Sequence, residues 1–394
     1  MRRLGGQAAR GLWTVLRVLL ALALGFVAVA GCGFAVLAWQ LAEHPIEMPW
    51  LAARLQAAAS DAAAPAQFQI GAATLAWEGF RAGLGAPIDI RLADVTVSDP
   101  TRGLHVEAPR AQLVLEPAPL LHGQLRPRSL AVLDPRITLT PDARLATAAK
   151  TGGTGWQATL RRFGRRVIVR NARISAPGQD WDVARLDAEL VRQADGRAEA
   201  SASIAGTLVG ASVTASLQAA EAAAGTVRLH AALAPVRPSA LAGLWPNAAA
   251  IAARADALSG VDAEATLDTS LMPVSLRFDL RTEPGTLRIV DSPVPMSSGH
   301  LAGSWRAGEA ARVDGSVELR PRPEQPSTHM AMHGEARLDG GSTTGQVTLG
   351  LDRVAFDDLA ALWPDGLARE ARKWVLDNIT AGVAHDGRVA LGFT

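Results

Sequence analysis

Apolar residues occupy every second position through most of the chain. In the run Ile88–Leu92 the apolar side chains alternate with Asp89 and Arg91, and the segment Val95–Ser98 resumes the pattern after Asp94. Because residues i and i+2 of a strand lie on the same face, each run predicts a strand with one apolar and one polar face.

The alternation recurs downstream, where Gly, Pro, Asp and Asn residues separate the runs at the intervals typical of antiparallel hairpins. The further runs are Ala111–Leu113, Arg136–Thr140, Val183–Leu190, Val274–Leu280, Val313–Arg320 and Val347–Leu349. We therefore predict a mainly β body built of strand meanders. A compact β-sandwich and an open trough share this periodicity, so the pattern leaves that choice open.

The N-terminal part has a different pattern, a long segment without charge. From Val18 to Ala42 no residue is charged, and a helix of that length, rising about 1.5 Å per residue, crosses a hydrocarbon core of about 30 Å. Arginines precede the segment and Glu43 follows it. The positive-inside rule then predicts a single pass through a bacterial inner membrane, with the body in the periplasm.

Two alternatives to an uncleaved anchor fit this segment less well. A cleaved signal peptide has an apolar region of only about 7–15 residues, which is shorter than this one. Cys32, the only cysteine, follows Val29-Ala30-Gly31 in a pattern that resembles a lipidation site, but the residues after it stay apolar. We favour the uncleaved anchor, and each alternative also tethers the body to a membrane.

An internal repeat indicates stacked units. A Leu-Ala-x-Leu-Trp-Pro motif occurs twice, each time after a strand-rich stretch and before an alanine-rich helical pattern over Asn247–Leu258 or Gly366–Ile379. Its repeated residues are Leu241, Leu244, Trp245 and Pro246 in the first copy and Leu359, Leu362, Trp363 and Pro364 in the second. We expect a buried corner that redirects the chain between strand sets, as in elongated solenoid-like bodies.

These boundaries predict the following organisation. Residues 1–17 are cytoplasmic, 18–42 form the transmembrane helix, 43–66 a juxtamembrane helix and linker, 67–142 a first β unit, 143–165 a linker, 166–258 a second β unit with a linking helix, 259–382 a third such unit, and 383–394 the start of a further, truncated unit. The fold class is thus an N-terminal transmembrane helix followed by an elongated antiparallel β-groove.

Composition and motifs argue against several functions. The formal charge is +1, with 39 basic and 38 acidic residues, so no strong field favours nucleic acid. No hydrolase elbow, phosphate-binding loop or dinucleotide motif occurs, and we assign no catalytic residue and no cofactor. His329 and His333 fall in one expected strand, where we expect them to point to opposite faces, so no metal site is predicted.

One arginine cluster is a candidate for binding. Arg161-Arg162 and Arg165-Arg166 flank Phe163 and Gly164, just before the strand expected at Val167–Val169. Such a cluster can hold a phosphate headgroup, but an arginine run is more often a solvated turn.

Several segments carry a resemblance to a known family. The juxtamembrane Ile46–Leu55, the strand Ile70–Gly79, Pro119–Leu125 with Leu130–Ile137, and the second Leu-Trp-Pro copy with Ala371–Val375 resemble the N-terminal portion of AsmA-like proteins. The resemblance is strongest to the lipid-transport bridge proteins of the YhdP and TamB type.

The resemblance implies a non-enzymatic function in outer-membrane biogenesis. It implies a membrane-anchored periplasmic bridge that carries phospholipid acyl chains in an apolar β-groove between the inner and outer membranes. The alternative is a periplasmic scaffold for outer-membrane protein assembly, with partner proteins bound at sheet edges. Candidate groove residues are Ile88, Ile90, Leu92, Val95, Val97, Leu113, Leu115, Ile137, Leu139, Leu276, Phe278 and Leu280.

Overall fold

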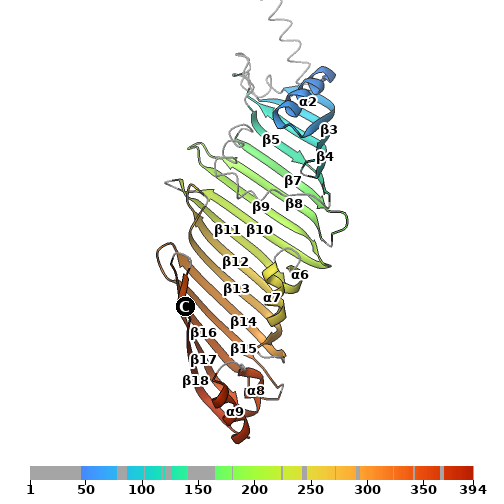
Figure 1. Cartoon of the computed structure of the whole chain (residues 1–394). Helices are drawn as coiled ribbons and strands as arrows, with labels where there is room; N and C mark the ends of the chain where they lie inside the picture. Colours follow the sequence, from blue (N-terminus) through green and yellow to red (C-terminus); the bar gives the residue numbers. More distant parts are fainter. Residues whose placement is uncertain are drawn as a thin grey trace, which may run out of the picture.

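The computed structural model of the chain contains one long, twisted sheet of 18 strands (Figure 1). It describes residues 46–77, 87–101, 103–116, 119, 127–140, 165–179, 181–222, 225–241, 246–270, 272–289, 293–322, 324–339, 342–363 and 368–393. A mainly β fold with a long sheet is therefore confirmed. The described residues form a single sheet, which is not the pair of facing sheets of a β-sandwich.

The strands follow one another along the sheet in chain order. They are β1 Ile46–Glu47, β2 Gln67–Trp77, β3 Ile88–Asp99, β4 Leu104–Leu115, β5 Pro127–Leu133, β6 Arg136–Leu139, β7 Arg166–Ser175, β8 Trp181–Arg192, β9 Ala198–Leu208, β10 Ala211–Glu221, β11 Val227–Val236, β12 Ala255–Leu267, β13 Pro273–Arg288, β14 Pro293–Arg306, β15 Ala311–Leu319, β16 Thr328–Asp339, β17 Ser342–Ala355 and β18 Val383–Phe393.

Almost every pair of neighbouring strands is antiparallel, as the hairpin pattern predicts. The exception is at β5 and β6, which both lie between β4 and β7 and both run parallel to β7. A parallel pair needs a crossover connection instead of a hairpin. The chain between Leu139 and Arg166 makes this connection, and most of it lies outside the described residues.

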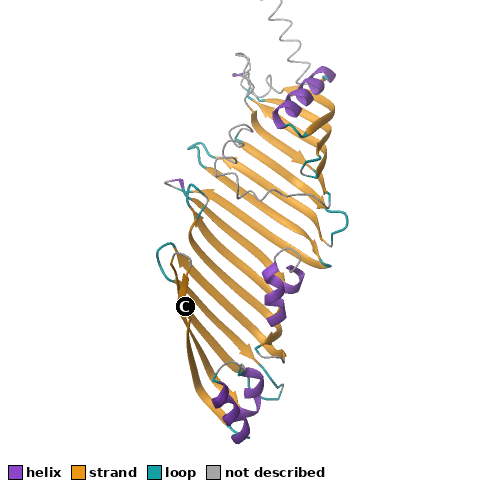
Figure 2. Cartoon of the chain, viewed as in Figure 1, coloured by secondary structure: helices purple, strands orange, loops and turns teal. Residues whose placement is uncertain are grey.

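The helical segments lie on one side of the sheet, at the ends of the strands, which we call the helix side (Figure 2). They are α2 Pro49–Ala63, α6 Pro238–Leu241, α7 Pro246–Arg254, η3 Phe356–Asp358, α8 Leu359–Leu362 and α9 Arg369–Asn378. The second and third groups fall between β11 and β12 and between β17 and β18. The strands β12 to β17 separate these two groups. Each antiparallel strand reverses the chain, so an even number of strands brings it back to the same side.

Helix α2 covers the first edge of the sheet. Ser60 Oγ accepts a hydrogen bond from the Phe68 N–H at 3.1 Å, and Gln56 Oε1 accepts one from the Ile70 N–H at 3.2 Å. β1 pairs with Thr74 and Leu75 of the same strand. The backbone donors of an edge strand would otherwise be open to another chain, so these contacts protect this end of the sheet.

The last strand has no such cover among the described residues. β18 pairs with β17 on one side only, and Val383, Leu391 and Phe393 on it are exposed. Its second edge is a row of backbone groups that a further strand can pair with.

A line of left-handed residues crosses the sheet between β3 and β7. Asp94 has φ 54°, Asp134 φ 55° and Asn171 φ 53°, and Asp and Asn are the residues that tolerate this conformation best after glycine. Asp94 and Asn171 interrupt the two-residue period of β3 and β7, and Asp134 lies between β5 and β6. Apolar residues before and after Asp94, such as Leu92 and Val95, can then stay on one face.

Polar contacts hold this line in place. Asn171 Nδ2 donates to Asp134 Oδ1 at 2.7 Å, and the Asn171 N–H donates to Asp187 Oδ1 at 2.8 Å. Arg110 Nη2 donates to Asp134 Oδ2 at 2.5 Å. The hydrogen bonds from Asn171 and then Arg110 lower the pKa of Asp134, and the bond from the Asn171 N–H lowers the pKa of Asp187.

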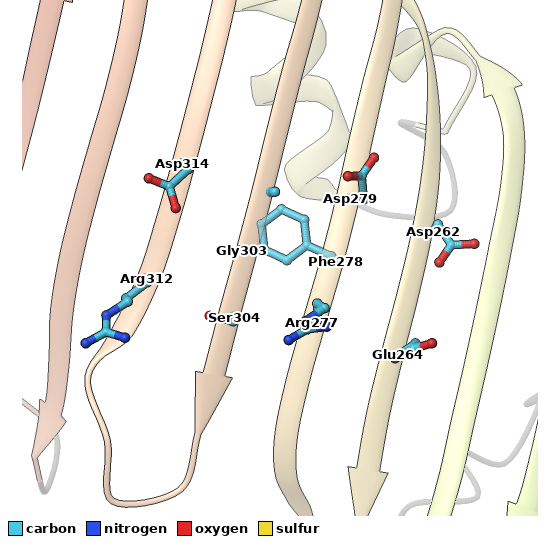
Figure 3. Close-up of a pocket in the computed structure, with 10 residues that line it drawn as sticks. Asp262, Glu264, Arg277, Phe278, Asp279, Gly303, Ser304, Arg312 and Asp314 are labelled. Carbon is cyan, nitrogen blue, oxygen red and sulfur yellow. The ribbon is translucent and has the colours of Figure 1, made fainter.

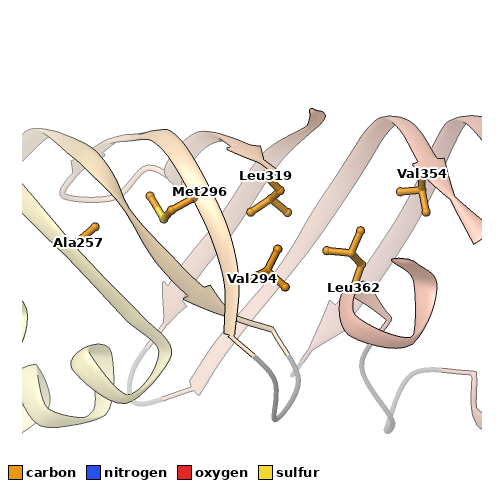
Figure 4. Packing of buried hydrophobic residues seen from close by; sticks show 6 residues of the cluster. All are labelled: Ala257, Val294, Met296, Leu319, Val354 and Leu362. Carbon is orange, nitrogen blue, oxygen red and sulfur yellow. The ribbon is translucent and has the colours of Figure 1, made fainter. Parts of the chain in front are cut away.

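The most buried apolar residues of the later strands gather beneath the helices of the helix side (Figure 4). Leu319 is fully buried, and the cluster consists of Ala257, Val294, Met296, Leu319, Val354 and Leu362. Leu362 comes from α8 and belongs to the second repeat motif, and Leu359 packs against the same cluster. These two motif residues therefore pack a helix onto strand ends.

Only some of the remaining motif residues lie within the described residues. Trp363 is half-buried, with its N–H bonded to the Leu359 carbonyl at 2.8 Å. Leu241 ends α6 and Pro246 begins α7, whereas Leu244, Trp245 and Pro364 lie outside the described residues.

The predicted anchor cannot be compared with the structure, because residues 1–17 and 18–42 lie outside the described residues. No helix within the described ranges combines the length and apolar character that a membrane crossing needs. The juxtamembrane helix expected within residues 43–66 corresponds to α2.

Candidate functional site: the apolar face of the sheet

One face of the sheet carries an uninterrupted row of apolar residues. Directly paired residues of neighbouring strands have side chains on the same face, so the register traces a row across the sheet. This central row runs through Ala73, Leu92, Ala111, Val132, Val169, Ala188, Ala202, Leu217, Ala231, Ala263, Phe278, Gly303, Val313, Gly334, Val347 and Leu391. From β2 to β18 it contains no polar side chain.

Two flanking rows widen this surface. One runs from β2 to β14 through Leu75, Ile90, Leu113, Leu130, Val167, Leu190, Ala200, Ala219, Leu229, Ala265, Leu276 and Trp305. The other runs from β7 to β18 through Ala172, Leu186, Ile204, Ala215, Leu233, Val261, Leu280, Leu301, Gly315, Met332, Leu349 and Val389. We call these three rows together the apolar face.

The opposite face is polar from β8 onward. The row next to the central row passes through Glu189, Ser201, Gln218, His230, Glu264, Arg277, Ser304, Arg312, Glu335 and Gln346. Ion pairs cross it, including Arg166 to Glu189 at 2.7 Å and Arg312 to Glu335 at 3.0 Å. The two faces therefore differ in chemistry along the same strands.

The structure places all twelve candidate groove residues on strands of this sheet, in register with apolar partners. Ile88, Ile90, Leu92, Leu113 and Leu115 pair with one another or with Trp77, Leu75 and Ala73. Val95 and Val97 lie opposite Ala108 and Val106, while Ile137 and Leu139 lie opposite Val106 and Leu104. Leu276, Phe278 and Leu280 pair with Trp305, Gly303 and Leu301.

Solvent exposure of this face changes along the sheet. Ile90 of this face is 4% exposed, and Leu115 and Leu139, which lie just outside the three rows, are 4% and 5% exposed, so all three belong to the core. Leu217 is 44%, Leu276 41% and Leu391 39% exposed. Several large apolar side chains exposed on one face are uncommon on a soluble monomer and mark a binding surface.

Glycines on this face leave space for the aromatic rings of their cross-strand partners. The Phe278 ring lies over Gly303 (Figure 3), where a Cβ atom would overlap the ring. A Cβ on Gly345 would lie 2.6 Å from Cζ of Phe393, its cross-strand partner. An aromatic ring over a cross-strand glycine fills the space that the missing side chain leaves.

The polar face also has a hollow, but its chemistry is that of a solvated surface. It measures about 320 Å³ and lies over Ala302, Gly303 and Ser304 of β14, between charged residues of β12, β13 and β15. His300 bonds Asp279 at 2.8 Å beside it, and this bond is the main cause of the lowered pKa of Asp279. Most of these charges already have partners in the sheet.

The expectation for the two β16 histidines was wrong. His329 pairs opposite Glu318 and His333 opposite Asp314, so both lie on the polar face. Residues four apart in a strand share a face, which the opposite-face expectation overlooked. The described residues contain no group of three or more potential ligands that could hold a metal ion.

Comparisons of the chain with protein-family models, with curated proteins and with solved structures found no match.

Proposed function

We propose that the chain is a membrane-tethered periplasmic bridge that carries phospholipid acyl chains along the apolar face of its sheet, as its resemblance to AsmA-like proteins implies. The central row supports this proposal most strongly, because it offers an acyl chain apolar contact on every strand from β2 to β18. The helices lie at the strand ends, and Leu217 and Leu276 in the middle of the face remain exposed. We infer a groove whose floor is this face.

The energetic requirement of lipid transfer fits such a surface. Exposing two acyl chains of about fifteen methylenes each to water costs on the order of 24 kcal/mol, at about 0.8 kcal/mol per methylene. A continuous apolar surface removes most of this barrier without a catalytic group. The segment 18–42 places the start of the sheet at the inner membrane in this proposal.

Adjacent residues on the two faces allow a sharp test. Leu217 belongs to the apolar face and Gln218, the next residue of β10, to the polar face. A photoreactive amino acid at position 217 of the full chain, irradiated in bacterial membranes, should give phospholipid adducts by mass spectrometry. The same group at position 218 should give few or none.

Equal labelling at the two positions, or no lipid at either, would contradict the proposal. The comparison is internally controlled because both positions are exposed and lie on one strand.

The open edge of β18 favours a second candidate, a scaffold for outer-membrane protein assembly. Unpaired backbone groups on an edge strand bind an extended segment of another protein by strand addition. Crosslinks from the β18 edge to assembly proteins, with no lipid adduct at position 217, would favour this alternative.

A further inference from the structure

Three arginines line up at one end of the apolar face. Arg128, Arg165 and Arg192 lie on neighbouring strands, at the start of β5, just before β7 and at the end of β8. The Arg165 N–H donates to the Arg128 carbonyl at 2.9 Å, and the Arg192 N–H donates to the Arg165 carbonyl at 2.7 Å. We call these residues the arginine row.

The register places the arginine row in line with apolar residues. Arg165 and Arg192 lie two positions from Val167 and Leu190, which pair with each other on the apolar face, and Arg128 lies beside Arg165 at a β-bulge at the start of β5. Positions two apart in a strand share a face. The row therefore ends the apolar face on the side opposite to the helices.

These arginines differ from their neighbours in having no carboxylate partner among the described residues. Arg166 and Arg170, on the polar face of β7, both pair with Glu189, at 2.7 and 3.0 Å. Two acids near this end of β8 have other partners: Asp195 pairs with Arg197 at 3.5 Å, and Glu221 Oε2 accepts the Ala198 N–H at 3.1 Å.

Arg192 is the least exposed of the three arginines. Its Nε is enclosed in the protein and has no hydrogen-bond partner in the described part of the chain. The side chains of both faces close together at this end of β7 and β8, where Arg165, Arg166, Val167, Leu190, Val191, Arg192 and Ala198 line a crevice too narrow to hold a ligand. The enclosed Nε is out of reach of a ligand, so an anion would bind the two outer nitrogens of the same guanidinium.

The geometry points to a phosphate group, carried on an acyl chain, as the ligand of the arginine row. Strands are about 4.8 Å apart, so three neighbouring side chains fall within roughly 10 Å and can converge on one tetrahedral anion. Arginine matches phosphate oxygens with two parallel donors. The acyl chain would then lie along Leu130, Val167 and Leu190. This inference rests on the proposed lipid function and names the headgroup class.

The test compares two lipids that differ only in the phosphate. Full-length protein in detergent is titrated with fluorescent phosphatidic acid, with diacylglycerol of the same acyl chains, and with inorganic phosphate. Replacing all three arginines (R128Q, R165Q and R192Q) should weaken phosphatidate binding about tenfold or more, because the phosphate loses its charged hydrogen-bond donors. Diacylglycerol binding should not change.

Matched variants distinguish binding by the arginine row from a general effect of positive charge on the protein. Arg185→Gln removes an exposed arginine of the polar face that pairs with Asp187, and it should leave both affinities unchanged. Arg192→Lys keeps the charge but loses the paired donors, so its phosphatidate affinity should lie between those of wild type and Arg192→Gln.

The possible failures are distinguishable. Unchanged phosphatidate affinity in the triple variant would overturn this inference while leaving the lipid function intact. Inorganic phosphate binding as tightly as phosphatidate would also overturn it, because the acyl chain would then contribute nothing. Wild type that binds neither lipid would overturn the proposed function itself.

Discussion

The first strands and the later strands carry the same apolar pattern but form two kinds of surface. In β3, β4 and β6 the residues Ile90, Leu115 and Leu139 are at most 5% exposed, whereas Leu217 on β10 and Leu276 on β13 exceed 40%. One part of the apolar face is therefore core and the other is accessible. The alternation of a strand specifies which side chains share a face. Other parts of the chain determine whether that face is covered.

The largest expected effect is on lipid binding in the exposed part. Leu217→Glu places a carboxylate in the central row, where an acyl chain would have to bury it without a partner. We expect phospholipid crosslinking and transfer to fall about tenfold or more, with little change in thermal stability. Ser216→Glu on the polar face is the control. Retained transfer in Leu217→Glu would mean that lipid does not follow the central row.

The second-largest expected effect is a loss of folding stability in the buried part of the sheet. Ile90→Ala should lower the free energy of unfolding by about 2–5 kcal/mol, because it leaves a cavity among packed residues. Leu276→Ala removes a half-exposed side chain and should cost less than about 1 kcal/mol. Denaturant titration of the two variants measures the contrast. Equal losses would show that the later face is also covered.

The junction between the two parts depends on Asn171. Asn171→Ala loses the bond to Asp134 and places alanine at a positive φ, so it should destabilise the protein by about 1–2 kcal/mol. Asn171→Gly restores the backbone freedom and should recover part of that loss. If both variants matched wild type in thermal melts, the polar contacts at the junction would be dispensable.

The smallest effect is on pH dependence at the same junction. Asp134 and Asp187 have folded pKa values below those of an unfolded chain, so each stabilises the fold above about pH 4. This contribution is lost as the pH falls through the lowered folded values. The stability difference between wild type and Asn171→Ala should therefore shrink on acidification. A difference that is constant from pH 7 to pH 3 would contradict this assignment.

Much of the sheet could be predicted from the period of two, but its interruptions could not. The pattern predicts Ile88–Leu92 and Val95–Ser98 as separate runs, and the structure joins them in β3 because Asp94 adopts a left-handed conformation within the strand. The parallel pairing of β5 and β6 with β7 had no signal in the hydrophobic pattern. It depends on a crossover, and crossovers are not encoded by strand periodicity.

Alanine-rich segments were the least predictable. The helix expected over Asn247–Leu258 ends at Arg254, and Ala255 begins β12. Ala257 is buried against Gly285 of β13, a tertiary contact that no local alanine pattern reveals. The arginine row shows the same limit, because Arg128, Arg165 and Arg192 are far apart in sequence and only the register brings them together.

The protected first edge has a consequence for how this architecture can be extended. Ser60 and Gln56 occupy the donors of β2, while β18 keeps its outer donors, so new strands can join at one end only. Each added strand lengthens the sheet by about 4.8 Å. The length of the sheet would then scale with the number of hairpins placed after β18, without any change at the end that α2 covers.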